Sequence, residues 1–280
     1  MARNTPIQWC DDSVNPVMGC NGCELWTSTV NRCYAGNLHK LRRNHKGFAS
    51  QFEVPETFPG RMHDASKAKD LAETDRTEKP WLDGLPRLIF VSDMGDALSQ
   101  SIEFEYLRDE IIQAAESEKG RRHRWLWLTK RPGRMATFSD WLSKRGEDWP
   151  TNLWAGTSVT SPDSDGRAKD LLSVGDDRTT RFLSVEPQLA AVDLTTSISK
   201  YDWVIQGGES SVRGKARPFH TEWAKELQEV CVEAGVPYFL KQLGSNPLRN
   251  GERLTLNDGH GGDWDEWPEH LRLRQMPACG

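Results

Sequence analysis

Six short apolar runs follow one another along the chain after residue 85, and each of them ends in small or polar residues. Runs of this length are typical of strands that are buried on both faces, as in parallel sheets. Helical periodicity separates some of the runs, from about 103 to 118 and from about 134 to 144. The predicted strands cover residues 88–91, 124–128, 153–155, 181–183, 203–206 and 238–240.

The clearest helix is expected between Thr221 and Gly235. Trp223, Leu227 and Cys231 recur there at helical spacing, so they fall on one face of the helix. Thr221 is a suitable N-terminal cap, and Gly235 is a suitable stop signal. We therefore expect an amphipathic helix that buries Cys231 in the core and does not use its thiol as a ligand.

The alternation of strands and helices determines the expected fold class. Strands joined by helical crossovers form a parallel sheet with right-handed connections, and residues 7–9 supply a seventh strand candidate. The sequence therefore predicts an α/β protein, a single-domain full or partial (β/α) barrel of six to seven parallel strands over residues 1–243. Periodicity fails in residues 244–280, which we expect to form a C-terminal tail or cap.

Polar residues at the ends of the predicted strands are expected to share one location. In a (β/α) barrel, the loops at the carboxyl ends of the strands build the active site. Such residues also serve as helix caps and as partners in structural ion pairs, and that alternative stays open for each of them. The candidate site residues are Asp93, Asp96, Lys130, Glu186, Gly207, Gly208, Glu209 and Lys241.

Three cysteines, Cys20, Cys23 and Cys33, lie close together in the predicted loop 20–35. Three thiolates are one short of a closed structural zinc site, whereas a metal that takes part in chemistry keeps an open coordination position. A four-iron cluster held by three thiolates likewise leaves one iron free for a small molecule. A zinc site completed by His39 or His45 is the alternative.

Charge and targeting signals restrict the class of protein. The net charge of −5 argues against a protein that coats nucleic acid by charge alone. The densest basic segment, residues 121–134, is expected to be a solvated face or a set of phosphate contacts. Residues 1–9 lack the apolar core of a secretory signal, and no stretch approaches the length of a membrane span, so we expect a reducing cytoplasm.

Several motifs resemble those of the phage Gp37/Gp68 family, a domain of unknown function that carries a three-cysteine motif. The resemblance extends over nearly the whole chain. It rests on residues 7–9, 15–20, 33–35, 127–132, 184–187, 207–210, 238–242 and 267–274. If the protein is encoded by a phage, the cytoplasm is that of the host cell.

That family is similar to radical S-adenosylmethionine enzymes and, more distantly, to spore photoproduct lyases. The resemblance implies a barrel of the radical-SAM type and a [4Fe-4S] cluster on Cys20, Cys23 and Cys33. It also implies S-adenosylmethionine as cofactor, cleaved reductively to a radical that takes a hydrogen atom from the substrate. A flavodoxin or ferredoxin would be the electron donor, and a nucleic-acid base or nucleoside the substrate. The spacing of the cysteines departs from that of most radical enzymes.

The same resemblance suggests roles for the residues at the strand ends. Asp93 and Asp96 would accept hydrogen bonds from the amino group and ribose hydroxyls of the cofactor, and Lys130 would bind its carboxylate. The backbone of Gly207 and Gly208 would allow a close approach of the cofactor. The residues expected to act on the substrate are Glu186, Glu209 and Lys241, the last of which could hold a substrate anion.

Two alternatives from other functional classes remain open. The first is a zinc-stabilised binding or adaptor protein that has no catalytic activity and contains Zn²⁺ in place of the cluster. The second is a hydrolase that uses magnesium or manganese, since oxygen ligands suit these ions. Its ligands would be Asp93, Asp96, Glu186 and Glu209.

Overall fold

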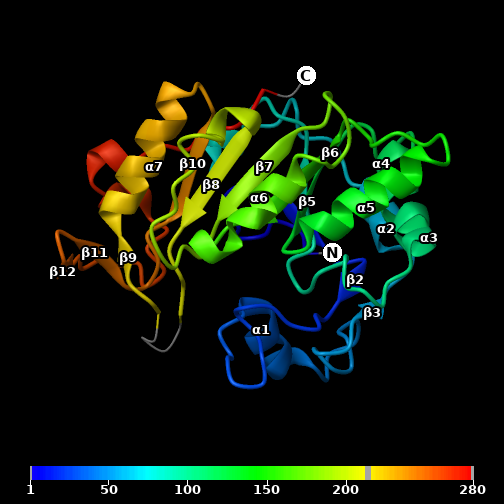
Figure 1. The fold of residues 1–280 in the computed structure, drawn as a ribbon, viewed down its shortest axis with the longest axis horizontal. Helices are drawn as coiled ribbons and strands as arrows, with labels where there is room; N and C mark the ends of the chain where they lie inside the picture. The colour runs from blue at the N-terminus through cyan, green and yellow to red at the C-terminus, as the bar shows by residue number, and fades with distance from the viewer. Residues whose placement is uncertain (1, 212–215, 279–280) are drawn as a thin grey trace.

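The computed structural model describes residues 2–211 and 216–278, and its largest element is a parallel sheet of seven strands. The sheet curls into a half-barrel with the order β1-β4-β5-β6-β7-β8-β10 (Figure 1). This confirms an α/β fold with about seven parallel strands. The strands are β1 (Asp12–Val14), β4 (Leu88–Val91), β5 (Arg124–Thr129), β6 (Leu153–Ser158), β7 (Arg181–Val185), β8 (Trp203–Gly207) and β10 (Tyr238–Gln242).

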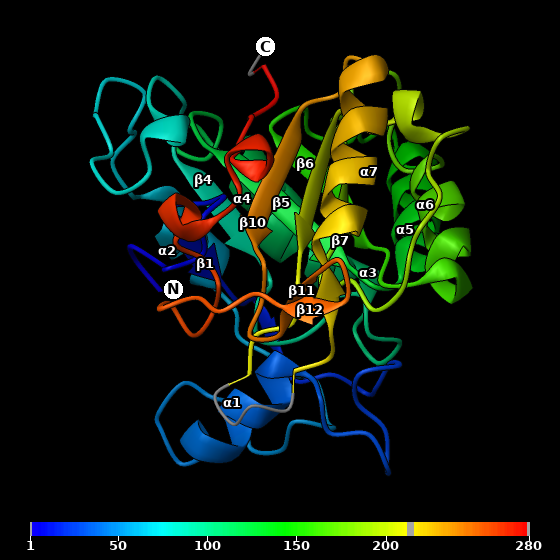
Figure 2. The same cartoon turned by 90° about the vertical axis from the view of Figure 1, so that its left-hand side faces the viewer.

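Helices cover the outer, convex face of the half-barrel (Figures 1 and 2). The segment predicted as one helix from 103 to 118 is helical, with a π-helical turn in its middle. His220, and not Thr221, is the N-cap of the last helix, and Gly235 follows its end with φ of 68°. The helices are α2 (Arg61–Ser66), α3 (Phe104–Leu107), the π turn (Arg108–Ile112), α4 (Gln113–Glu116), α5 (Pro132–Ser143), α6 (Asp165–Leu171) and α7 (Thr221–Glu233).

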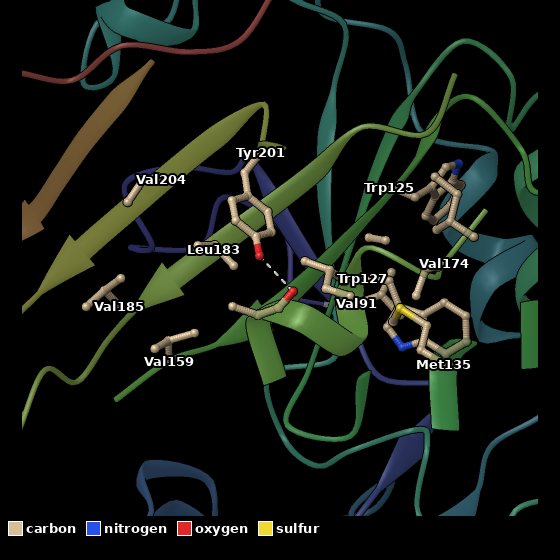
Figure 3. Packing of buried hydrophobic residues seen from close by; sticks show 14 of the residues in the cluster. Val91, Trp125, Trp127, Met135, Val159, Val174, Leu183, Val185, Tyr201 and Val204 are labelled. Carbon is tan, nitrogen blue, oxygen red and sulfur yellow. Dashed lines mark hydrogen bonds between the residues drawn. The ribbon is translucent and has the colours of Figure 1, made fainter. Parts of the chain in front are cut away.

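The main core lies between the sheet and these helices (Figure 3). Successive strand residues point to opposite faces, so alternate side chains of each strand enter this layer. Trp127 stacks on Trp149 with ring centroids 5.8 Å apart. Tyr201 donates a hydrogen bond of 2.8 Å to the carbonyl of Ala168 in α6. Cys231 is fully buried in the same layer, which confirms its place in the core.

A second core fills the inner face of the half-barrel, and it is mainly aromatic. Trp9 lies 4.6 Å from Phe90 and 6.3 Å from Trp203, measured between ring centroids. The prediction that residues 7–9 form a strand is therefore wrong. Trp9 turns inward to fill the open side of the half-barrel, and the first strand, β1, begins three residues later.

A small lobe, residues 19–60, projects beyond the carboxyl ends of the strands (Figures 1 and 2). We call it the α1 lobe, after α1 (Tyr34–Arg42). Its core is small: Trp26 packs edge-on against Phe52, and Gly36 leaves room for the Trp26 ring. At its base, β2 (Val17–Met18) pairs with β3 (Glu56–Thr57).

The C-terminal segment covers the edge of the sheet beside β10. The guanidinium of Arg274 lies 4.3 Å from the Trp81 ring centroid, and its Nη2 donates to the carbonyl of Lys241 at 3.0 Å. Burial lowers the pKa of Arg274 to about 10. Residues 244–280, as far as the structure describes them, therefore pack onto the half-barrel. Their strands are β11 (Pro247–Arg249), which pairs with β9 (Phe219–His220), and β12 (Glu252–Arg253).

Single 3₁₀ turns complete the architecture within the described residues. Among the same residues, no helix is both long enough and apolar enough to cross a membrane. The turns span Pro80–Leu82, Pro162–Ser164, Ile198–Lys200, Trp264–Glu266 and Glu269–Leu271.

Candidate functional site

Polar side chains follow the aromatic ones toward the carboxyl ends of the strands on the inner face. Phe182 of β7 belongs to the inner core. Glu186 follows four residues later, and because side chains alternate between the two faces, it points to the same face. On β10, Phe239 precedes Lys241 in the same way. The charges of Lys241 and Asp93 both act on the buried thiol of Cys10. The candidate residues thus form a polar layer directly above the aromatic core.

Glu186 and Lys241 form a direct ion pair in this layer. The pair joins the ends of β7 and β10 across β8, the strand that lies between them. Gly207 lies beside the pair, and a Cβ there would be in ordinary van der Waals contact with the Glu186 carboxyl carbon, at 3.4 Å. Both side chains keep a small exposed fraction, 14% for Glu186 and 20% for Lys241, so the pair is accessible from the mouth of the half-barrel.

Lys130 lies between the polar layer and the cysteines. Its ammonium donates to the hydroxyl of Ser158 at 3.3 Å. Burial raises the pKa of Cys23, and the Lys130 charge opposes that effect. The same charge also helps to lower the pKa of Glu24. Lys130 is therefore a cation near the cysteine loop that forms no ion pair with the described residues.

Asp93 and Asp96, which the sequence treats alike, differ in their surroundings. Asp96 is buried, and its carboxylate accepts hydrogen bonds from the Thr129 hydroxyl at 2.8 Å and the Lys130 amide at 3.0 Å. Asp93 accepts one hydrogen bond at Oδ1, from Asn15 at 2.5 Å, and its Oδ2 has no partner among the described residues. Asp93 can thus receive a ligand, whereas Asp96 holds the ends of β4 and β5 together.

Glu209 is held by arginines. Its carboxylate accepts from Arg217 at 2.8 and 2.9 Å and lies 3.8 Å from Arg32 of the α1 lobe. Burial would raise the pKa of Glu209, but the hydrogen bonds from Arg217 outweigh burial and lower it. Glu209 is therefore ionised, and this pairing favours a structural role over a catalytic one.

Gly208 is required by packing. A Cβ at this position would lie 2.3 Å from the Leu243 carbonyl oxygen, inside any permitted contact. Its amide donates to the Gln242 carbonyl at 3.0 Å. Close approach of β10 explains this glycine, and no ligand is needed to account for it.

The three cysteines lie in the α1 lobe, above the same strand ends. Gly19 pairs with Gly95 after β4, and the Gly95 position has no space for a side chain because the Gly19 carbonyl lies against it. Arg131, after β5, donates to the Asn21 side chain and to the Gly22 carbonyl. Glu24 binds Arg167 of α6 at 2.7 Å. These contacts hold the loop across the ends of three strands.

All three thiols are half-buried. Burial, assisted by the Asp96 charge, raises the pKa of Cys20 to about 11, and burial also raises that of Cys23. Cys20 and Cys23 influence each other electrostatically, as do Cys23 and Cys33. Cys33 is the N-cap of α1.

Three soft thiol ligands suit an iron–sulfur cluster or zinc. In the part of the chain that the structure describes, no three Cys, His, Asp or Glu side chains converge closely enough to hold a metal ion. Binding to all three sulfurs would therefore require the loop to contract and the thiols to release their protons. The chemistry of the donor set fits a metal centre, but the described positions of the three side chains do not bring them together into one.

The remaining histidines and cysteines lie apart from this loop. Nε2 of His39 is 2.7 Å from the Ala49 carbonyl inside the lobe, and His45 is exposed. Cys10 is fully buried in the inner core, where burial raises its pKa well above the usual value. Cys279 lies outside the described residues.

A comparison with family models places the chain in a group of proteins. Residues 4–268 match a family described as "Protein of unknown function (DUF5131)". The chain belongs to the DUF5131 family. No curated protein and no solved structure gives a significant match. The half-barrel, the α1 lobe and the polar layer all lie inside the range that the DUF5131 model matches.

Two further residues of the candidate site were not among the site residues predicted from the sequence. Ser92 follows β4 and is buried, yet its hydroxyl has no hydrogen-bond partner among the described residues. Buried polar atoms usually have a partner, so Ser92 is a candidate ligand contact next to Asp93. Asn15 donates to Asp93 and accepts from the Met94 amide at 2.9 Å. The sequence feature that indicates these two residues is their position directly after the strands β4 and β1.

The basic segment 121–134 does not form one surface. It contains the whole of β5, so the cations on its two sides lie at opposite ends of the sheet. Arg122 donates to the Ala68 carbonyl at 2.8 Å at the amino end, and Arg131 contacts the cysteine loop at the carboxyl end. The cations of this segment are therefore divided between the two ends of β5.

Proposed function

We propose that this protein is an iron–sulfur, S-adenosylmethionine-dependent radical enzyme of the phage Gp37/Gp68 type. Its substrate would be a nucleic-acid base or nucleoside, and a flavodoxin or ferredoxin in the cytoplasm would donate the electron. The observation that carries the proposal is the position of Cys20, Cys23 and Cys33 above the carboxyl ends of a parallel half-barrel. A partial barrel of the radical-SAM type would use that end for chemistry.

The described residues can divide the work of binding the cofactor. The three thiols would hold the cluster, which supplies the electron for cleavage of S-adenosylmethionine when it is bound. The Lys130 ammonium, without an ion-pair partner, suits the cofactor carboxylate. Asp93 Oδ2 and the Ser92 hydroxyl, both without partners among the described residues, suit its amino group and hydroxyls.

The Glu186–Lys241 pair lies on the substrate side of the proposed site. An ion pair in a half-buried setting can open to bind a polar or anionic group, because the exchange keeps each charge partnered. Lys241 would receive the anion and Glu186 a donor of the substrate. Gly207 leaves the space between them free of a side chain.

The test is an anaerobic purification followed by assays of iron, sulfide and zinc. We expect about four irons per chain and broad absorbance near ~400 nm, as for thiolate-bound clusters. The Cys23→Ala variant should lose the iron, and the matched variant Cys231→Ala, which removes a core thiol, should keep it. Cofactor cleavage in the presence of a reductant would then be measured by chromatography.

Two results of the metal assays would overturn the proposal. Stoichiometric zinc without iron, with folding lost on chelation, would identify a zinc-stabilised binding or adaptor protein. Iron retained by Cys23→Ala would also contradict it, because the cluster would then lie elsewhere.

A further inference from the structure

One segment of the α1 lobe, residues 25–52, is far more basic than the rest of the chain. Residues 25–52 contain no Asp or Glu, whereas the whole chain has 41 acidic residues against 36 Lys and Arg. The cations of this segment lie on α1, on the turn after it and on the loop before it. They are Arg32, Lys40, Arg42, Arg43 and Lys46.

Most of these cations are exposed and lack partners. The side chains of Arg42, Arg43 and Lys46 form no ion pair or hydrogen bond with any residue that the structure describes. Outside this segment, arginines are commonly paired with carboxylates, as Arg87 is with Asp12 and Arg167 of α6 with Glu24. The contrast marks the C-terminal end of α1 and the turn after it as a patch of uncompensated positive charge.

The helix dipole explains only part of this charge. Cations in the last turn of a helix are stabilised by its negative end, which accounts for Lys40 and Arg42. Arg43 is the C-cap, and Lys46 lies beyond the helix, where the dipole effect fades within one turn. Lys40 is also engaged within the lobe, 4.6 Å from the Trp26 ring centroid. A structural explanation therefore leaves Arg43 and Lys46 unaccounted for.

Two large apolar side chains are exposed on the same helix. Tyr34 is 67% exposed and Leu41 is 77% exposed. They are seven residues apart and so lie on one face of α1, two turns from each other. The charge of Asp93 at the strand ends acts on the Tyr34 hydroxyl, as does that of Arg42. Tyr34 is thus an exposed aromatic ring on the same helix as Arg42, and its hydroxyl is within electrostatic range of both Arg42 and Asp93.

We propose that the α1 lobe binds single-stranded nucleic acid, with Arg42, Arg43 and Lys46 on the phosphates and Tyr34 stacked on a base at the mouth. Uncompensated cations next to an exposed aromatic ring are the combination that binds single strands. The proposal deepens the proposed function, on which its link to turnover rests, because it makes the substrate polymeric. Binding itself requires no turnover and is tested separately.

The experiment measures binding of fluorescein-labelled 20-nucleotide DNA and RNA strands of the same sequence by fluorescence anisotropy, at several salt concentrations. The test variant is Arg42→Gln/Arg43→Gln/Lys46→Gln. The matched control, Lys119→Gln/Arg121→Gln/Lys200→Gln, removes three exposed cations that precede β5 and β8, at the opposite end of the sheet. Circular dichroism checks that each variant is folded.

The test variant should bind at least tenfold more weakly, and its plot of log affinity against log salt should be shallower by about 2, since each neutralised phosphate contributes about 0.7. The control should stay within twofold of the unmodified protein. Tyr34→Ala should weaken binding at least about fivefold, and Tyr34→Phe, which keeps the ring, should not. Comparison of the affinities for the DNA and the RNA oligonucleotide shows which type of nucleic acid the protein prefers.

Equal losses in the test and control variants would overturn the proposal, because charge alone, and not the lobe, would then govern binding. Stronger binding to vesicles containing phosphatidylserine than to either strand would overturn it in favour of a membrane surface. If strands bind as expected but no iron is found, the nucleic-acid inference stands and the radical mechanism fails.

Discussion

The half-barrel and the α1 lobe are built in different ways, although they face each other across the candidate site. The sheet has an apolar layer on each face, with side chains such as Trp127 and Trp203 fully buried. The lobe has one small core around Trp26 and Phe52, and polar contacts tie it to the sheet. The half-barrel therefore has far more buried apolar surface than the lobe, and we expect it to be the more stable of the two regions.

The largest effect should come from the inner core of the sheet. Trp203→Ala removes a fully buried ring and its hydrogen bond to the Gln275 carbonyl, and should lower the free energy of unfolding by about 3–5 kcal/mol. Trp26→Ala in the lobe should change the unfolding of the sheet by less than about 1 kcal/mol. Urea denaturation would measure both, and equal losses would show that the two regions unfold together.

The Cys20 thiol of the lobe should react slowly with alkylating reagents at neutral pH. Because the pKa of Cys20 is about 11 instead of 9.0, its thiolate fraction at pH 7 should be roughly a hundredfold below that of an ordinary cysteine. Alkylation by iodoacetamide, followed by mass spectrometry, should accelerate as the pH rises toward 11. Rapid alkylation of Cys20 at pH 7 would mean that the loop holds a thiolate even without metal.

Two glycine-to-alanine substitutions, at Gly208 and Gly166, compare the effect of close packing in the sheet with the effect of helix propensity. Gly208→Ala should lower the free energy of unfolding by about 1–3 kcal/mol, since the new methyl group would meet the Leu243 carbonyl. Gly166→Ala in α6 meets nothing within 4 Å, so it should stabilise the protein by up to about 1 kcal/mol. Thermal unfolding would compare them. A tolerated Gly208→Ala would imply that β10 can move away.

The smallest effect should come from a contact that joins the two regions. Burial would raise the pKa of Glu24, but hydrogen bonds and the charge of Arg167 outweigh it and lower the pKa to about 2. A lowered pKa means that the stabilisation is complete above pH about 4.5 and is lost as the pH falls toward 2. Glu24→Gln should cost less than about 1 kcal/mol and remove this pH dependence. Amide exchange in the lobe at pH 3 and pH 7 would measure it.

Local periodicity predicted the parts of the fold that depend on local sequence. All six apolar runs after residue 85 are strands, and the predicted helix before Gly235 is present. A strand buried on both faces gives a continuous apolar run in the sequence, and a helix buried on one face gives apolar residues at helical spacing. The inward turn of Trp9 and the wrapping of Arg274 over β10 depend on contacts far along the chain, which no short window records.

The same limit applies to the site. Strand-end positions anticipated that Glu186 and Lys241 lie close together, because parallel strands end at one edge, and they placed Lys130 next to the end of β6, where it contacts Ser158. They could not distinguish Asp93, which keeps a free oxygen, from Asp96, which does not. Hydrogen-bond partners decide that difference, and the partners come from separate loops.

The most direct measurement is amide hydrogen exchange of the whole protein before and after anaerobic reconstitution with iron and sulfide. If the thiols of the α1 lobe hold a cluster, exchange should slow in residues 19–60 and stay unchanged in the strands of the half-barrel. Incorporation of iron with no added protection in residues 19–60, or protection confined to the sheet, would contradict the account.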